Sequence, residues 1–295
     1  MNRIGAIFTP YFPPEALRDA AQAAEESGVP ELWLWEDCFR ESAFATASAV
    51  LAWTTRMRVG IGVAPMPMRN VALTAMEIAT VERMFPGRLI PGVGHGVQSW
   101  MGQIGARVAS PLGLMREYVP ALRSLLAGAE TSASGRYVSL DRVRLDWPPA
   151  DPPPVMVAGE GPKTVRLTGE VGDGTVLPAG STPERVASTL ALAREGRAAA
   201  DRPGPHELVV FVEAAFDPRH APPAASDPAA SDSAPVDPAD GAAPVAGAPE
   251  EVAAALEPYF TAGATRVILQ PPLADRNLTE FLAGAGTVAR LLQAA

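Results

Sequence analysis

The chain has 295 residues, 47% of them hydrophobic, and a formal net charge of −9 at pH 7. This length suits one large α/β domain, and the apolar content supplies a sizeable core. The acidic balance and the lack of any Lys/Arg block argue against nucleic acid or an anionic membrane surface as partners. The single cysteine, Cys38, excludes a disulfide framework and a cysteine-based zinc site. Because the sequence has neither a signal-peptide core nor a run of about 18 apolar residues, we expect a soluble cytoplasmic protein.

Short apolar runs alternate with amphipathic helical patterns over the first third of the chain. The run at 31–35 is apolar on both faces, which is typical of a parallel strand that is covered on both sides. Glycines inside the run at 58–64 indicate a bulge or the close approach of another group. The predicted strands are 3–8, 31–35, 58–64 and 89–93, and the helices between them are 14–27, 44–55 and 70–85.

The rest of the chain continues the alternation, with one interruption of different composition. Strands are predicted at 155–158, 174–177, 207–216 and 266–270, a surface hairpin at 135–146, and helices at 98–104, 114–126, 162–170, 184–200, 250–262 and 278–292. Residues 217–249 are rich in Pro, Asp, Ala and Ser, a composition that cannot bury a core. We therefore predict a disordered insertion within a single domain that spans 1–295.

Eight predicted strands that alternate with helices indicate a (β/α)₈ TIM barrel of the α/β class. The surface insertion falls between strands 4 and 5, and the disordered loop follows strand 7. The competing fold is a doubly wound open sheet, but the first strand-to-helix turn, at 9–13, has no glycine fingerprint. In a barrel the carboxyl ends of the strands meet at one mouth, where active sites lie.

A histidine between two glycines follows the fourth predicted strand, in Gly94-His95-Gly96. An unperturbed imidazole titrates near ~6.5, so His95 could carry a proton or contact a substrate at the mouth. The alternative is a solvated histidine on an ordinary strand-to-helix turn.

Two carboxylates, Glu36 and Asp37, follow the second predicted strand. Because side chains alternate along a strand, one of them should point into the mouth, for proton transfer or for contact with a cofactor. The alternative is that one of them caps the next helix.

The turn after the fifth predicted strand has the features of a phosphate site. Gly159 and Gly161 flank it, and Pro162, Lys163 and Thr164 open the following helix. Free backbone N–H groups, the helix dipole and Lys163 together suit a phosphate. A bare helix N-terminus is the alternative, and the Walker pattern of ATP sites is missing.

Several other residues are predicted to lack a functional role. We expect His206 and His220 to be exposed, and Trp33 and Trp35 to be core residues packed against the covering helices. With only three histidines and no closely spaced His/carboxylate set, we predict no metal site.

Four segments together resemble the bacterial luciferase-like family of flavin- and deazaflavin-dependent oxidoreductases. They are Leu32-Trp33-Leu34-Trp35-Glu36-Asp37; Arg56-Met57-Arg58-Val59-Gly60-Ile61-Gly62-Val63-Ala64-Pro65 leading into Arg69-Asn70; Phe85-Pro86-Gly87-Arg88-Leu89 with Gly92-Val93-Gly94; and Gly161-Pro162-Lys163 with Gly169-Glu170-Val171-Gly172-Asp173-Gly174. The resemblance covers nearly the whole chain except 217–249. It implies the same barrel, with a flavin or deazaflavin ring lying in its mouth.

The resemblance also implies positions for the cofactor. A bulge with a non-prolyl cis peptide would support the ring within 60–64, best placed at Gly62–Val63 and followed by Ala64. Gly94 would lie beside the ring, and Gly161-Pro162-Lys163-Thr164 would hold the cofactor phosphate. Relatives often have Asp-His where this chain has Glu36-Asp37, so a mechanism that needs a histidine there is in doubt.

Three functions follow from the resemblance. The first is an oxidoreductase that uses coenzyme F420 for hydride transfer to or from a small organic substrate, because Glu36-Asp37 and Gly161-Pro162-Lys163 are more similar to the deazaflavin branch. The second is an FMN-dependent monooxygenase supplied by a separate flavin reductase, and the third is a non-catalytic barrel. A homodimer is implied only by the resemblance.

Overall fold

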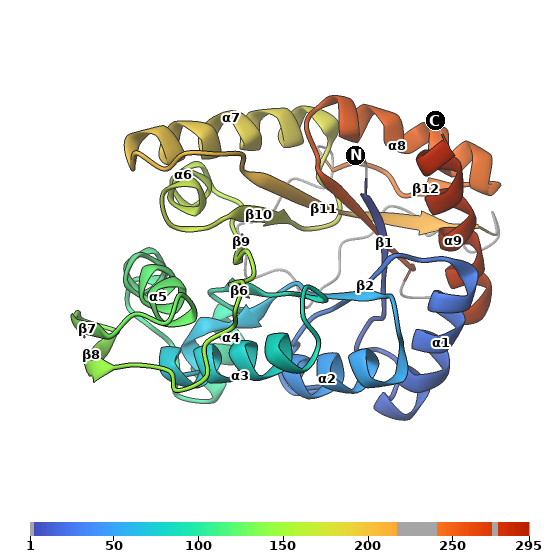
Figure 1. Cartoon of the computed structure of the whole chain (residues 1–295). Coiled ribbons are helices and arrows are strands. Elements are labelled where there is room, and N and C mark those ends of the chain that lie inside the picture. Colours follow the sequence, from blue (N-terminus) through green and yellow to red (C-terminus); the bar gives the residue numbers. More distant parts are fainter. Residues whose placement is uncertain (1–2, 217–240, 273–276, 295) are drawn as a thin grey trace.

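The computed structural model describes residues 3–216, 241–272 and 277–294, and within these residues eight parallel strands form a barrel surrounded by helices (Figure 1). The predicted (β/α)₈ fold is confirmed. In chain order the strands are β1 (Arg3–Ile7), β2 (Glu31–Leu34), β3 (Arg58–Ile61) with β4 (Ala64–Pro65), β5 (Leu89–Ile90) with β6 (Gly92–Gly94), β9 (Met156–Ala158), β10 (Gly174–Leu177), β11 (Glu207–Ala215) and β13 (Arg266–Gln270).

The barrel closes because each strand pairs in parallel with the next, and the last strand pairs with the first. In β1, Ala6 lies opposite Leu269 of β13 on one side and Leu32 of β2 on the other. The third and fourth predicted strands are each interrupted once. The cis peptide bond Gly62–Val63 separates β3 from β4, and Pro91, which has no N–H for the ladder, separates β5 from β6.

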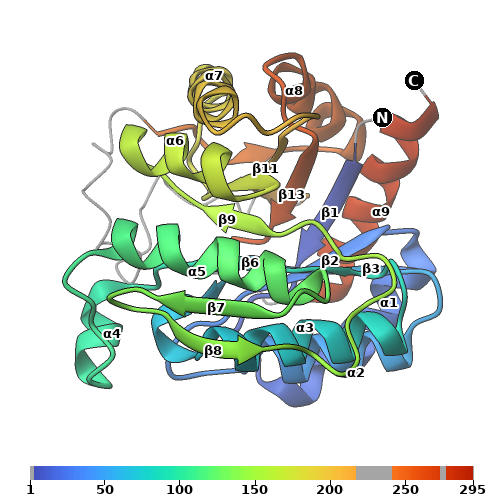
Figure 2. The same cartoon turned by 60° about the vertical axis from the view of Figure 1, so that its left-hand side comes forward.

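The helices lie outside the ring of strands, as both views show (Figure 1, Figure 2). Their apolar faces and the outward side chains of the strands form the larger of two core clusters. No helix in the described ranges is long and apolar enough to cross a membrane. The helices that follow the strands are α1 (Leu17–Ser27), α2 (Ala43–Trp53), α3 (Val71–Met84), α5 (Pro111–Leu126), α6 (Pro162–Val171), α7 (Pro183–Ala199), α8 (Pro249–Thr261) and α9 (Leu278–Ala294).

The insertion between the fourth and fifth barrel strands holds α4 (Gln98–Gln103) and a hairpin of β7 (Thr131–Ser134) and β8 (Ser139–Val143) beside α5 (Figure 2). The predicted hairpin began four residues too late, because 135–138 form its turn. The carboxylate of Glu117 accepts hydrogen bonds from the backbone N–H groups of 136–138, which fixes this turn to α5.

The end of the predicted disordered insertion is ordered, which corrects the prediction for 241–249. β12 (Val245–Ala246) pairs in parallel with the end of β11, with Val245 opposite Ala214. Pro249 then opens α8. Backbone hydrogen bonds to β11 thus order a segment whose composition predicts disorder. The remainder of the insertion, 217–240, lies outside the described residues.

A second apolar cluster fills the barrel itself. Trp33 belongs to this inner cluster, together with Ile7, Ile90, Met156, Val176, Val209, Phe211 and Ile268. Trp33 is fully buried, but it does not pack against the covering helices as we predicted. Its neighbours Leu32 and Leu34 belong to the outer cluster, because alternate residues of a strand point to opposite faces.

A layer of charged side chains lies below the inner cluster, at the amino ends of the strands. Glu31 accepts hydrogen bonds from Arg58 (3.3 Å), Arg266 (3.2 Å) and the indole N–H of Trp33 (3.1 Å). Arg266, which is 1% exposed, also pairs with Glu207. This layer therefore links four of the barrel strands, β2, β3, β11 and β13.

We predict that Glu31→Gln lowers the free energy of unfolding by about 3 kcal/mol, because it leaves the buried Arg266 without one of its two carboxylates. Urea denaturation measures the change. Glu26→Gln, on an exposed position of α1, is the matched control and should change stability by less than about 0.5 kcal/mol. Equal effects of the two substitutions would contradict the structural role of the charged layer.

Candidate active site

The floor of the barrel mouth is apolar and largely aromatic. Trp35, Val63 and Ala179 are partly buried and pack on top of the inner cluster. The ring of Phe211 lies 6.1 Å from that of Trp35 at an angle of 33°, and 5.9 Å from that of Trp33 at 71°. This floor offers flat apolar surface to a planar ligand.

Close packing beside the floor requires glycine at two positions, one between β3 and β4 and one in β6. A Cβ atom on Gly62 would lie 2.7 Å from Phe211 Cζ, and one on Gly94 would lie 2.6 Å from Val63 Cγ2. Any side chain here would displace the residues of the floor. The cis peptide predicted for 60–64 is confirmed at Gly62–Val63.

Trp35 contributes the one polar atom of this floor that sequence reasoning missed. Its indole Nε1–H is buried and has no hydrogen-bond partner among the described residues. An indole N–H can only donate, so it offers a hydrogen bond to an acceptor atom on a ligand. The alternation of β2, in which Trp33 points into the barrel, could have placed Trp35 at the mouth instead of under the helices.

Glu36 is held by its neighbours instead of facing open space. Its carboxylate makes a bidentate pair with the guanidinium of Arg69, with one N–O distance of 2.7 Å, and accepts from the backbone N–H of Ala43 at 3.3 Å. Ala43 is the first residue of α2, so Glu36 contacts a helix N-terminus, as in the alternative interpretation. Arg69 also binds Glu77 at 3.1 Å. The geometry therefore favours a positioning role for Glu36.

Asp37 and Glu41 lie in the same loop between β2 and α2. Asp37 is half-buried, and its carbonyl oxygen accepts from the backbone N–H of Arg40 at 2.8 Å. Burial raises the pKa of Glu41 to about 7, while Arg40 opposes the change. Glu41 can therefore hold a proton at neutral pH, a property that no local sequence pattern indicated.

His95 is half-buried after β6, and one hydrogen bond of its ring defines the tautomer of the neutral form. Nδ1 lies 2.9 Å from the carbonyl oxygen of Gly96, which can only accept, so Nδ1 carries the proton of the neutral ring. Nε2 is then the acceptor. Gln98 binds the carbonyl oxygen of His95 at 3.2 Å and so steadies the loop.

The turn at 159–164 ends at the first turn of α6, as predicted. Gly161 is the N-cap residue, Pro162 is the first helical residue, and the first intrahelical hydrogen bond runs from Val165 N–H to Gly161 O. The N–H groups of Lys163 and Thr164 precede that bond and have no intrahelical acceptor. Lys163 is exposed, and a Cβ on Gly161 would meet no described atom within 4 Å. This terminus is open to an anion.

The carboxylate of Glu213 is a further polar group at the mouth that sequence reasoning missed. Val209 and Phe211 of β11 belong to the inner cluster, so Glu213, two residues further on, points to the same side, at the carboxyl end. Gln270 lies opposite Glu213 on β13. A carboxylate within the otherwise apolar run 208–216 was the signal that could have found Glu213.

His206 was predicted to be exposed, but it is only 6% exposed, because it immediately precedes β11 and its ring contacts Thr175 of β10. Thr168 donates its single hydroxyl proton to Val165 O. In the contact between the two threonines, the hydroxyl of Thr175 must therefore donate to Thr168 Oγ1. Thr175 Oγ1 must then accept from His206 Nε2 at 2.8 Å. The neutral ring is therefore the Nε2–H tautomer, and its Nδ1 has no partner within the described part of the chain.

Comparison with known proteins identifies the family of this chain. The luciferase-like monooxygenase family matches residues 2–225, and the chain belongs to this family. Its sequence is 28% identical to a 5,10-methylenetetrahydromethanopterin reductase of Methanolobus tindarius, over 72% of this chain and 64% of the reductase. It is also 28% identical to an F420-dependent glucose-6-phosphate dehydrogenase of Kineococcus radiotolerans, over 92% of each chain.

A solved structure supports the fold. An F420-dependent secondary alcohol dehydrogenase, in complex with an F420–acetone adduct, superimposes with a TM-score of 0.82. The match covers 97% of each chain at 22% identity, so it bears on the fold alone.

We predict opposite tautomers for the two described histidines at pH 8, with Nδ1–H in His95 and Nε2–H in His206. Long-range ¹H–¹⁵N correlation spectra distinguish the two forms, and three histidines keep the spectrum simple. A His95→Gln variant assigns the His95 signals. An Nε2–H form of His95 would contradict its contact with Gly96.

Proposed function

We propose that the chain is an oxidoreductase that uses coenzyme F420 to transfer a hydride to or from a small organic substrate. The observation that carries the proposal is the flat aromatic floor of the mouth, with glycines packed closely beside it. The F420-dependent glucose-6-phosphate dehydrogenase, which matches over 92% of both chains, supports the same cofactor.

The residues at the mouth fit a deazaflavin ring and its phosphate. The N–H of Trp35, which has no hydrogen-bond partner among the described residues, suits a ring with carbonyl oxygens. The floor around Val63 suits the flat face of such a ring. When bound, the cofactor supplies the hydride chemistry, and the protein supplies orientation and a shaped pocket. We assign ring contacts to Gly62, Val63, Ala64 and Gly94.

The cofactor phosphate is assigned to the N-terminus of α6. The open N–H groups of the first turn and the positive end of the helix dipole favour an anion there. Lys163 adds a positive charge on an exposed side chain. The residues proposed to hold the phosphate are Gly159, Gly161, Pro162, Lys163 and Thr164.

His95 is proposed as the residue that moves a proton at the substrate. The hydrogen bond from Nδ1 to Gly96 orients the ring and leaves Nε2 to accept or, after protonation, to donate. Asp37 is proposed as a second polar contact at the mouth. Glu36 instead fixes the loop after β2 through Arg69.

The FMN-dependent monooxygenase remains the second hypothesis, because a flavin ring would meet the same floor. It would require a separate flavin reductase as partner. The homodimer and the cytoplasmic location remain predictions from the sequence. Separate fluorescence titrations with F420 and FMN decide between the two cofactors. Binding of F420 alone supports our proposal, binding of FMN alone supports the second hypothesis, and binding of neither leaves the non-catalytic barrel.

We predict that Gly94→Ala weakens F420 binding about tenfold, which corresponds to ~1.4 kcal/mol. The new methyl group would meet Val63 Cγ2 at 2.6 Å and push Val63 across the floor. The fluorescence titration measures the change. Gly102→Ala in α4 is the matched control, because no described atom lies within 4 Å of its added Cβ. Unchanged binding in Gly94→Ala would place the ring elsewhere.

We predict that His95→Ala lowers turnover about 100-fold or more, because it removes the proton carrier. The Kd for F420 should stay within about twofold, since the ring rests on other residues. Turnover is followed as the change in F420 absorbance, with glucose 6-phosphate and secondary alcohols as first substrates. Loss of F420 binding in this variant would show that the assigned role of His95 is wrong.

A further inference from the structure

A cleft of about 350 Å³ lies at the end of the barrel opposite the mouth. Its walls come from α7, from the loop that enters β11 and from the turn between α8 and β13, all of which precede barrel strands. Its lining is basic and includes three arginines and a histidine, Arg194, Arg197, Arg202 and His206. The proposed function uses none of these residues.

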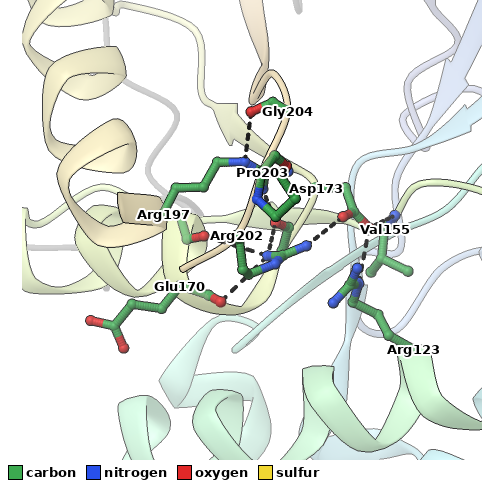
Figure 3. A network of polar contacts seen from close by, with 10 residues as sticks. Arg123, Val155, Glu170, Asp173, Arg197, Arg202, Pro203 and Gly204 are labelled. Carbon is green, nitrogen blue, oxygen red and sulfur yellow. Dashed lines mark hydrogen bonds and ion pairs between the residues drawn. The ribbon is translucent and has the colours of Figure 1, made fainter. Parts of the chain in front are cut away.

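The arginines around this cleft carry more positive charge than nearby carboxylates neutralise. Asp173 is shared by two guanidinium groups, those of Arg123 (3.1 Å) and Arg202 (2.7 Å), as Figure 3 shows. Neither Arg194 nor Arg197 has a carboxylate partner in the described part of the chain. The local excess of positive charge contrasts with the net charge of −9 of the whole chain.

Arg197 and Arg202 are rigid parts of the wall. The guanidinium of Arg197 donates to the carbonyl oxygens of Pro203 (2.9 Å), Gly204 (3.0 Å) and Gly172 (3.3 Å). Arg202 donates to carbonyl oxygens at the end of α6 (Figure 3). These two residues supply fixed positive charge, while the exposed Arg194 has N–H groups available for a ligand.

His206 adds an acceptor to this basic wall. Thr175 occupies its Nε2, so within the described ranges Nδ1 is left without a hydrogen-bond partner, on a side chain that is 6% exposed. Burial, with the charges of Arg197 and Arg202, lowers the pKa of His206 to about 4 and keeps the ring neutral. A ligand here would have to accept from arginine and donate to Nδ1.

We propose that this cleft binds a phosphate group that carries a proton, either inorganic phosphate or a small phosphomonoester. The charged oxygens of such a group accept from Arg194, and its P–OH donates to Nδ1 of His206. A carboxylate or a sulfate at neutral pH has no proton to donate and satisfies only the arginines. The cleft has the volume of about ten waters, which leaves room for a short organic group beside the phosphate.

The full-length protein is titrated with inorganic phosphate at pH 6.0 and constant ionic strength, because at this pH a phosphomonoester also keeps a P–OH in much of its population. The ¹⁵N signals of His206 are followed. We expect a saturable shift of the Nδ1 signal with phosphate and none with equal concentrations of sulfate or acetate. No shift with phosphate, or equal shifts with all three anions, would overturn the proposal.

Substitutions then locate the site. Arg194→Ala should weaken phosphate binding at least tenfold, whereas Arg56→Ala, another exposed arginine at the same end of the barrel, should leave it unchanged. The second contact is tested with His206→Gln, which keeps a donor for Thr175 but lacks Nδ1. Isothermal titration calorimetry should show that phosphate affinity falls at least tenfold in this variant too, while its melting temperature stays unchanged. Equal effects of Arg194→Ala and Arg56→Ala would mean that phosphate is attracted by the overall positive charge and not by a specific site, and would overturn the proposal.

A third experiment distinguishes inorganic phosphate from a phosphomonoester as the ligand. It also tests whether the phosphate binds in the cleft or at the mouth. Glycerol phosphate should shift the same His206 signals if a phosphomonoester fits, and inorganic phosphate alone should do so if the site takes only the free ion. Lys163→Ala, at the mouth, should leave both titrations unchanged. Loss of the His206 shift in Lys163→Ala would place the phosphate at the mouth and overturn the proposal, independently of any result with F420.

Discussion

The buried pairing of Glu31 with arginines is the interaction on which the rest of the barrel depends. One carboxylate joins β2, β3 and β13, and its second oxygen accepts the indole N–H of Trp33. Trp33 is thereby held in the centre of the barrel, where it supports Phe211, and Phe211 supports Trp35 at the mouth. The charged layer at one end thus fixes the flat floor at the other.

The two ends of the barrel differ in the chemistry that they offer. The mouth combines an apolar floor, glycines without steric bulk and a helix terminus, which together suit a flat cofactor with a phosphate tail. The opposite end combines fixed arginine charge with the lone pair of a neutral histidine. Most barrels use that end for stability, as Asp173 and Arg197 do here, where they fasten the loops between helices and strands.

Much of the fold and part of the candidate site followed from the sequence. The alternation of apolar runs with helical patterns predicted the strands of the barrel, and their order predicted which loops meet at the mouth. The resemblance to the family predicted the cis peptide at Gly62–Val63. The pairing of Glu36 with Arg69 could not be predicted, because Arg69 is 33 residues away in the chain and no local pattern connects them.

Hydrophobic periodicity and glycine placement are properties of neighbouring residues, so the sequence by itself determined the barrel, its mouth and the turn that opens α6. Tertiary structure alone decided that Trp33 fills the barrel, that Glu36 is paired and that His206 is buried. Each of these outcomes depends on contacts between segments brought together only when the ring of strands closes. The tautomer of His206, whose Nδ1 has no partner among the residues that the structure describes, also depends on a chain of hydrogen bonds through Thr175 and Thr168.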